Sequence, residues 1–192
     1  MSSTNRGAVR QPDDYYSTPA WCTRAIVPHL NSPSSVLDPC AGAGAILDVV
    51  RDWAGPEPEL IAYDINERVA EIQTASIKAH TDSLVQYSAW HQVDLIITNP
   101  PYSLALPFVK RACDYLSQWG KGQAAFLLRL AFLESKERNT FLRNRMPDDV
   151  YVLPKRPSFI NGKTDSCAYA WFVWGPEAHG EAAELSVLEV GK

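Results

Sequence analysis

The residues Asn99-Pro100-Pro101-Tyr102 form a turn that could hold and align a planar amine. The two prolines fix the backbone and lack N–H donors, so carbonyl groups are left pointing outward. We expect the Asn99 side-chain oxygen and the Pro100 carbonyl to form a pair of acceptors for the two N–H groups of such an amine. Tyr102 offers an aromatic face, and stacking of a nucleic-acid base on such a face is worth about 1–3 kcal/mol.

The same pair of acceptors could make the amine reactive. An exocyclic amine conjugated to a ring is a poor nucleophile, and hydrogen bonds that favour a tetrahedral nitrogen make its lone pair more available. The turn therefore predicts direct in-line transfer to that nitrogen, catalysed by positioning and by acceptors matched to developing positive charge. Such a mechanism needs no metal, covalent intermediate or strong base. A turn that only stiffens the end of a strand is the structural alternative.

A loop of small residues at 38–45, with the sequence DPCAGAGA, indicates a ligand site. Small side chains let a ligand approach the backbone, and the amides of a following helix favour its polar groups. The loop lacks the lysine of a phosphate-binding loop, and Leu47 stands where a dinucleotide fingerprint has its third glycine. The Asp38 carboxylate suits a cation, so S-adenosylmethionine, with its ammonium and sulfonium, fits better than a pyrophosphate. Asp64 could accept both ribose hydroxyls.

Strands that alternate with helices position these residues. The predicted strands and helices are as follows: strands 35–37, 59–63, 93–98, 124–130, 150–153 and 168–174, and helices 44–53, 66–79, 104–118 and 133–145. Alternation of this kind indicates a parallel sheet covered on both faces, and the last two strands are close enough to pair antiparallel. Asp38, Asp64 and Asn99 all fall at predicted strand ends, where such sheets bind ligands.

Composition predicts one ordinary globular domain. The chain has 192 residues, of which 46% are hydrophobic and 21% charged. No apolar run reaches the roughly 18 residues of a membrane span, and the polar N-terminus lacks a signal core, so we expect a cytoplasmic protein. The four cysteines form no CxxC pair, which argues against a zinc site or a disulfide framework. We expect residues 1–175 to form the domain and 176–192 a loosely held acidic tail.

The distribution of charge leaves nucleic acid open as a partner. The net charge of −4 argues against binding through bulk positive charge. However, residues 110–163 contain 11 Lys and Arg against 5 Asp and Glu, whereas the remainder contains 7 against 17. The basic residues of 136–145 could equally be a solvated helix face of mixed charge. We expect any nucleic acid to contact the later half of the chain.

From about Tyr16 to Trp174 the sequence resembles the S-adenosylmethionine-dependent N6-adenine DNA methyltransferases, most of all the small phage-type members with the gamma order of motifs. Residues 38–44 resemble their cofactor loop, and 99–102 match their catalytic motif. Residues 16–19, Tyr-Ser-Thr-Pro, resemble the segment that packs on the methionine part of the cofactor. The resemblance implies these cofactor-binding residues: Tyr16, Thr18, Pro19, Asp38, Pro39, Cys40, Ala41, Gly42, Gly44, Asp64 as the ribose acid, Ile65, Asp82 beside the adenine of the cofactor, and Asn99.

The resemblance also implies a fold and a way of binding substrate. The fold would be the Rossmann-like class I methyltransferase fold, with a mostly parallel seven-stranded sheet, an antiparallel last strand and helices on both faces. An adenine of duplex DNA would be flipped out and methylated at N6. Phe159 would stack on it opposite Tyr102, although a buried loop anchor is an alternative for Phe159. Lys155, Arg156 and Lys163 would contact the DNA.

Other activities fit the same motifs. A protein glutamine side chain and an adenine of RNA also present planar amines, and a non-catalytic cofactor-binding module is a different class altogether. We expect no separate target-recognition domain. Recognition would then come from loops 133–147 and 157–166, from relaxed specificity, or from a partner chain such as a second copy in a homodimer.

Overall fold

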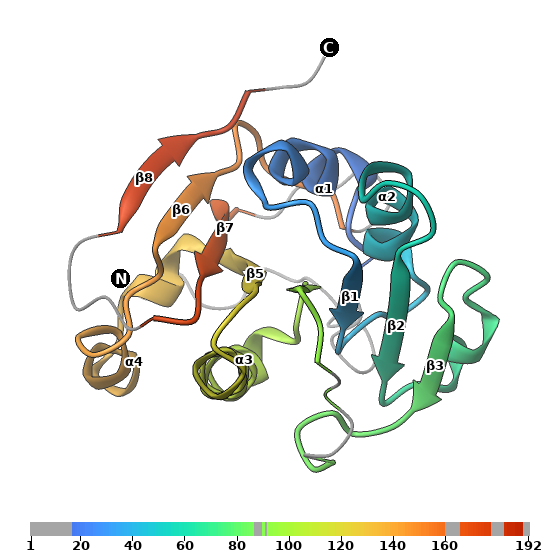
Figure 1. Ribbon diagram of the computed structural model, residues 1–192. Coiled ribbons are helices and arrows are strands. Elements are labelled where there is room, and N and C mark those ends of the chain that lie inside the picture. Colours follow the sequence, from blue (N-terminus) through green and yellow to red (C-terminus); the bar gives the residue numbers. More distant parts are fainter. Residues whose placement is uncertain (1–16, 87–89, 91, 160–165, 178–182, 190–192) are drawn as a thin grey trace.

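The computed structural model describes residues 17–86, 90, 92–159, 166–177 and 183–189. These residues form one eight-stranded sheet with the order β3-β2-β1-β4-β5-β7-β6-β8 (Figure 1). The strands are β1 (Ser35–Asp38), β2 (Glu59–Asp64), β3 (Ile77–His80), β4 (Leu95–Thr98), β5 (Gln123–Arg129), β6 (Asp149–Val152), β7 (Tyr169–Trp174) and β8 (Glu184–Val187). The helices are α1 (Ala20–Ile26), α2 (Ala45–Trp53), α3 (Ala105–Trp119) and α4 (Lys136–Leu142), with 3-10 turns η2 (Val27–His29), η3 (Glu67–Glu71), η5 (Tyr102–Leu104) and η6 (Leu130–Leu133).

The pairing of the strands confirms the expected α/β sheet and corrects its size. Strands β1 to β5 pair in parallel, and β7 runs antiparallel to both β5 and β6. The expectation of seven strands was wrong, because β8 pairs in parallel with β6 at the edge of the sheet. β8 lies within the segment 176–192 expected to be a loosely held tail, so part of that segment belongs to the sheet.

Both faces of the sheet are covered, as the uninterrupted apolar strands predict. All residues of β4 and β7 are buried, which is the pattern of strands that pack on both sides. Helices α1 and α2 cover one face and α3 and α4 the other (Figure 1). Each helix turns an apolar stripe toward the sheet; in α2 the buried residues are Ile46, Leu47, Val49 and Val50. In the described part of the chain, no helix is long and apolar enough to cross a membrane.

The helix predicted at 66–79 is not present. Asn66 caps only the 3-10 turn η3, its side chain accepting a hydrogen bond from the Arg68 amide at 3.2 Å. The chain then becomes extended, and the Ser76 amide donates to the Leu60 carbonyl at 2.8 Å. Strand β3 continues this pairing along β2. The neighbouring strand therefore satisfies the backbone groups that a helix would have satisfied internally, and this tertiary pairing overrides the helical spacing.

The topology brings the polar strand ends to one edge of the sheet. The strand order reverses at β1, which has β2 on one side and β4 on the other. Parallel strands carry their carboxyl ends to the same edge, so Asp38 of β1, Asp64 of β2 and Asn99 directly after β4 lie at neighbouring positions. Such a reversal is where open α/β sheets bind ligands.

Candidate active site

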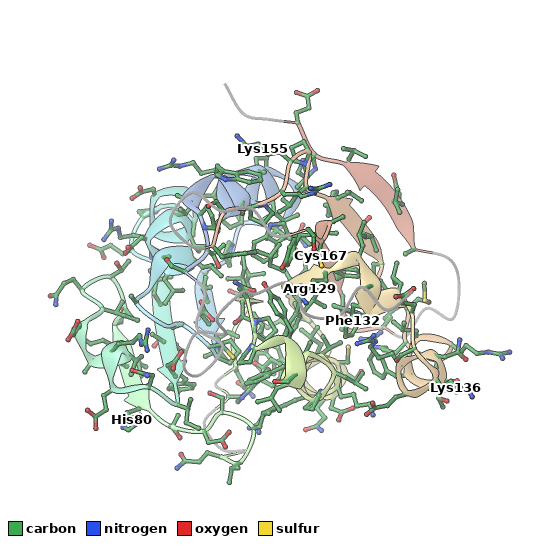
Figure 2. The ribbon with its side chains drawn as sticks, turned by 180° about the vertical axis from the view of Figure 1, so that it is seen from behind. His80, Arg129, Phe132, Lys136, Lys155 and Cys167 are labelled. Atoms are coloured by element: carbon green, nitrogen blue, oxygen red, sulfur yellow. The ribbon has the colours of Figure 1, made fainter. Side chains whose placement is uncertain are left out.

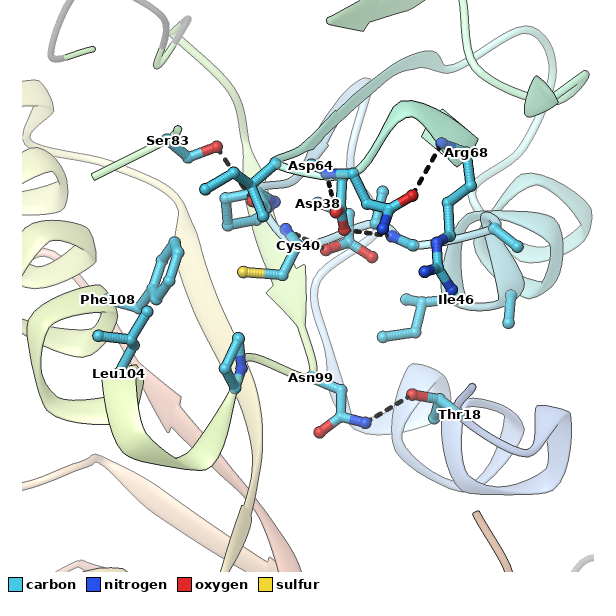
Figure 3. A pocket seen from close by; sticks show the side chains of 18 of the residues that line it. Thr18, Asp38, Cys40, Ile46, Asp64, Arg68, Ser83, Asn99, Leu104 and Phe108 are labelled. Atoms are coloured by element: carbon cyan, nitrogen blue, oxygen red, sulfur yellow. Dashed lines mark hydrogen bonds between the residues drawn. The ribbon is translucent and has the colours of Figure 1, made fainter. Parts of the chain in front are cut away.

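The carboxyl ends of β1, β2 and β4 border a pocket with about 860 Å³ of open space (Figure 3). Most of the residues that the sequence indicates for the cofactor line it. These are Thr18, Asp38, Pro39, Cys40, Ala41, Gly42, Asp64, Ile65, Asp82 and Asn99, together with Pro101 of the turn.

Asp38 is the most deeply buried carboxylate of the pocket, with 1% of its surface exposed. Its Oδ1 accepts a hydrogen bond from the Cys40 amide at 3.0 Å. Burial raises the pKa of Asp38 to about 7, although the Cys40 amide opposes the rise, and the Asp64 charge adds to it. A carboxylate in such surroundings is stabilised by a neighbouring cation. A cation that enters the pocket beside Asp38 would therefore favour the charged form of this carboxyl.

Asp64 fixes the glycine loop to the end of β2. Its Oδ2 accepts from the Gly42 amide and its Oδ1 from the Asn66 amide, both at 2.7 Å. The Ala41 amide also donates to the Tyr63 carbonyl at 2.9 Å. Each carboxylate oxygen has two lone pairs, so Asp64 keeps acceptor capacity after making these bonds.

Gly44 closes the loop and begins the turn into α2. Its φ of +86° lies in the left-handed region, and a Cβ built on it would lie 2.9 Å from the Cγ2 of Ile72. Both the backbone conformation and the contact with Ile72 therefore require glycine. Gly44 shapes the pocket in this way without lining it.

Asn99 is linked to the segment that precedes α1. Its Nδ2 donates to the Oγ1 of Thr18 at 3.1 Å, a bond seen in Figure 3. Thr18 is 5% exposed, and Pro19 follows it as the N-cap residue of α1. The bond joins two segments that are 81 residues apart in the sequence, at the carboxyl end of β4. It fixes the plane of the Asn99 amide relative to the pocket.

A loop after β3 forms another wall, and sequence reasoning identified only Asp82 in it. The Oδ1 of Asp82 accepts from the Leu84 amide at 2.9 Å. Ser83 donates to the Pro39 carbonyl at 3.0 Å and so joins this wall to the glycine loop. Arg111 of α3 is 7% exposed and donates to the carbonyls of Leu84 and Gln86 at 2.8 and 2.7 Å. Arg111 is therefore an internal anchor of the loop.

Tyr102 lies beside the pocket in an aromatic cluster. Its ring centre is 4.4 Å from the guanidinium carbon of Arg129 and 5.9 Å from the ring centre of Tyr169. Phe159 contacts the same Tyr169, with ring centres 5.2 Å apart. The two aromatic residues expected to hold a base thus share one neighbour, which the sequence analysis did not identify.

The basic residues of 110–163 do not form one surface. Arg111 and Arg145 are buried, and Arg145 donates to the carbonyls of residues 175 and 177. Arg138 donates to the carbonyls of residues 131 and 134, and Lys121 pairs with Asp94 at 3.3 Å. These side chains serve the fold.

Lys155 and Arg156 are exposed. Lys155 lies beside α1, with its Nζ 4.9 Å from the ring centre of Trp21. Figure 2 shows it well apart from Lys136 of α4. The excess of positive charge in residues 110–163 is thus divided between separate parts of the molecule.

Some expected residues have other positions. Pro100 and Tyr102 adjoin the pocket without lining it, whereas Tyr16 and Lys163 lie outside the described residues. The sequence motifs do not indicate these lining residues: Ile46, Asn66, Arg68, Thr81, Ser83, Leu84, Leu104 and Phe108. Figure 3 shows Leu104 and Phe108 on one side of the space and Ile46 on the other. The apolar side chains of these three residues carry no chemical signature in the sequence.

Among the described residues, no cluster of His, Cys, Asp and Glu could hold a metal ion.

Many solved structures resemble this chain, including the following three. A methyltransferase subunit of a type I restriction-modification system from Streptococcus thermophilus is 16% identical, with a TM-score of 0.61, over 83% of this chain and 44% of that one. A protein assigned as a class I S-adenosylmethionine-dependent methyltransferase from Listeria monocytogenes is 15% identical, with a TM-score of 0.60, over 88% and 62%. A protein assigned as an RNA methyltransferase from Pyrococcus horikoshii is 13% identical, with a TM-score of 0.59, over 89% and 92%.

The chain thus spans only 44% and 62% of the length of the first two structures. No protein-family model and no curated protein sequence matches it. The likeness in structure agrees with the strand order, with the antiparallel β7 and with the pocket at the reversal of that order. The chain therefore has the fold of the class I S-adenosylmethionine-dependent methyltransferases.

Proposed function

We propose that this protein transfers a methyl group from S-adenosylmethionine to the N6 amine of adenine in DNA. The observation that carries the proposal is the position of Asn99. It follows β4 and lies on the wall of the same pocket that Asp38 and Asp64 border. A planar amine held by Asn99 would therefore face a cofactor held between the two carboxylates.

The groups of the pocket fit S-adenosylmethionine. Asp38 offers a buried negative charge to the ammonium of the cofactor. Asp64 has remaining lone pairs for the ribose hydroxyls. Leu104 and Phe108, with Ile46 opposite, supply apolar contacts for the adenosine part. When bound, the cofactor supplies an electrophilic methyl group on its sulfonium.

Asn99 and Pro100 would hold and activate the amine. The bond from Asn99 Nδ2 to Thr18 fixes the amide, so that Oδ1 can accept one N–H of the amine. The Pro100 carbonyl can accept the other. Both acceptors favour the positive charge that develops on nitrogen as it attacks the methyl group. The surplus proton then leaves the nitrogen to solvent, so no strong base is needed.

The adenine must leave the duplex to reach Asn99. Tyr102 would stack on the flipped base, and Phe159, in the same aromatic cluster, would contact it as well. Lys155 and Arg156 are exposed and would contact phosphates. Lys163 belongs to the same proposal.

The resemblance of residues 38–44 and 99–102 to the DNA-modifying family favours DNA over RNA or glutamine as the substrate. The fold is shared with a type I restriction-modification methyltransferase subunit and with a protein assigned as an RNA methyltransferase, so the choice rests on these motifs. Within this chain, loops 133–147 and 157–166 would contribute to the reading of a target sequence.

One assay tests the proposal. The purified protein is incubated with isotope-labelled S-adenosylmethionine and unmethylated DNA, RNA or protein, and the digested products are identified by mass. We expect labelled N6-methyladenine from DNA. Label found only in RNA or glutamine would overturn the choice of substrate, and no label in any of them would overturn the proposed activity.

Asn99→Ala tests the catalytic part. Loss of one preorganised hydrogen-bonding group should lower kcat by about 100-fold or more, while cofactor binding measured by calorimetry persists. Asn31→Ala, which removes an exposed asparagine between η2 and β1, is the matched control. Equal kcat values for the two variants would refute the role of Asn99.

A further inference from the structure

Arg129 connects the sheet to the ring of Tyr102. It is the last residue of β5 and pairs directly with Tyr169, the first residue of the antiparallel β7. Directly opposed residues share one face of a sheet, so the two side chains meet. The Nε of Arg129 donates to the Oη of Tyr169 at 3.1 Å. Figure 2 shows Arg129 near the centre of the view, well apart from Lys136 and His80.

The same guanidinium also covers one face of Tyr102. Its carbon lies 4.4 Å from the Tyr102 ring centre, within the distance of a favourable cation–π contact. Tyr169 is 1% exposed and is fixed within the sheet. The orientation of the Tyr102 ring is thus set by a rigid strand through Arg129, although Tyr102 itself lies in the short turn η5.

We propose that Arg129 is a positioning residue for the substrate base. It holds Tyr102 so that the ring face away from the guanidinium is presented to a planar base. This inference rests on the proposed function and adds to it a residue that acts through Tyr102. The planar guanidinium is important here, because a lysine ammonium would retain the charge but could not stack flat while also bonding to Tyr169.

The test compares variants of Arg129 with a matched loss of charge elsewhere. Arg129→Leu should lower kcat/KM for DNA by about three- to thirty-fold, the value of a partly desolvated cation–π contact, with KM for S-adenosylmethionine unchanged. Arg129→Lys should lie between this variant and the wild type. Tyr169→Phe removes only the hydroxyl that holds the guanidinium, and it should lower kcat/KM for DNA less than Arg129→Leu does. Arg51→Leu, at the far end of α2 in an exposed pair with Asp52, should match the wild type.

A double-mutant cycle separates positioning from other roles. If Arg129 acts through Tyr102, Arg129→Leu should cost little more in the Tyr102→Leu background, because the contact is already lost. Full additivity would overturn the inference. A second result would also overturn it. If the slope of log K for DNA binding against log salt concentration becomes about one unit less steep in Arg129→Leu, Arg129 contacts a phosphate directly.

The outcomes distinguish this inference from the proposed function. If the wild-type protein methylates adenine in DNA and Arg129→Leu and Tyr169→Phe both equal it, only the inference on Arg129 is overturned. If the wild-type protein methylates no adenine, both are overturned. If Arg129→Leu does not fold, the Arg129→Lys and Tyr169→Phe kinetics decide the question, and unchanged values for both would refute the positioning role.

Discussion

Replacing Asp38 with asparagine tests the main electrostatic feature of the pocket. The side chain is 1% exposed, and burial raises its pKa to about 7. Asparagine keeps the size of the side chain and an oxygen for the Cys40 amide, but it removes the negative charge. If the pocket is built for a cation, the substitution should stabilise the ligand-free protein and weaken cofactor binding at the same time.

The magnitude follows from the shift of the pKa. A rise from 3.8 to about 7 corresponds to about 4 kcal/mol of differential free energy, at about 1.36 kcal/mol per unit. Because the folded protein holds this proton more tightly than the unfolded chain, stability falls as the pH rises from about 4 to about 7. The loss of stability caused by the buried charge of Asp38 is absent below that pH range and complete above it. We therefore expect Asp38→Asn to raise the free energy of unfolding by up to about 4 kcal/mol at about pH 8, and by far less at about pH 4.

Denaturant unfolding of both proteins across this pH range measures the effect. The difference between wild type and variant isolates Asp38 from groups that titrate in both, such as Asp149, whose pKa is also raised, chiefly by burial. Calorimetry with S-adenosylmethionine should show wild-type affinity that strengthens up to about pH 7, and weaker, pH-independent affinity for the variant. Parallel stability curves, or equal affinity at high pH, would refute the reasoning.

Three further predictions concern the stability of the fold and the walls of the pocket. Gly44→Ala forces a φ of +86° on alanine and brings its Cβ to 2.9 Å from Ile72 Cγ2, so it should lower the free energy of unfolding by about 1–3 kcal/mol; an unchanged urea midpoint would contradict this. The pKa of Asp94 lies below its usual value, since hydrogen bonds such as that from the Ser34 amide outweigh the effect of burial. The charged Asp94 therefore stabilises the fold at neutral pH but not in acid. Asp94→Asn should lower the free energy of unfolding by about 1 kcal/mol or less at neutral pH and leave it unchanged in strong acid. This pH dependence is the opposite of that expected for Asp38. Arg111→Met removes two hydrogen bonds to the loop it anchors and should weaken cofactor binding about tenfold, which equal affinities in calorimetry would disprove.

The sequence predicts the sheet best where strands are buried on both faces. The runs 93–98 and 168–174 are mostly apolar, and they contain β4 and β7, with β7 antiparallel to β6 as expected. The errors lie at the two edges of the sheet. Strands β3 and β8 have few buried residues, because an edge strand pairs on one side only. Their formation depends on a neighbouring strand, which local spacing does not reveal.

The polar strand ends were predictable for a similar reason. Asp38, Asp64 and Asn99 are set at the ends of apolar runs, and parallel topology brings such ends together. Arg111 and Arg129 were not predictable, because their roles depend on contacts with distant segments. Arg111 binds carbonyls 27 and 25 residues earlier in the chain, and Arg129 bonds to a tyrosine 40 residues later. Only the fold shows which cations turn inward.

This distinction changes what the charge of residues 110–163 means. Among the described residues of this segment, five cations make hydrogen bonds or ion pairs within the protein, namely Arg111, Lys121, Arg129, Arg138 and Arg145. Fewer cations are thus available to phosphates than the sequence count suggests. If the proposed function is correct, phosphate contacts would supply affinity and not sequence information, and discrimination would depend on how the base itself is held. The cluster around Tyr102 is where the described structure offers such contacts, and the orientation of that ring follows from Arg129 and Tyr169.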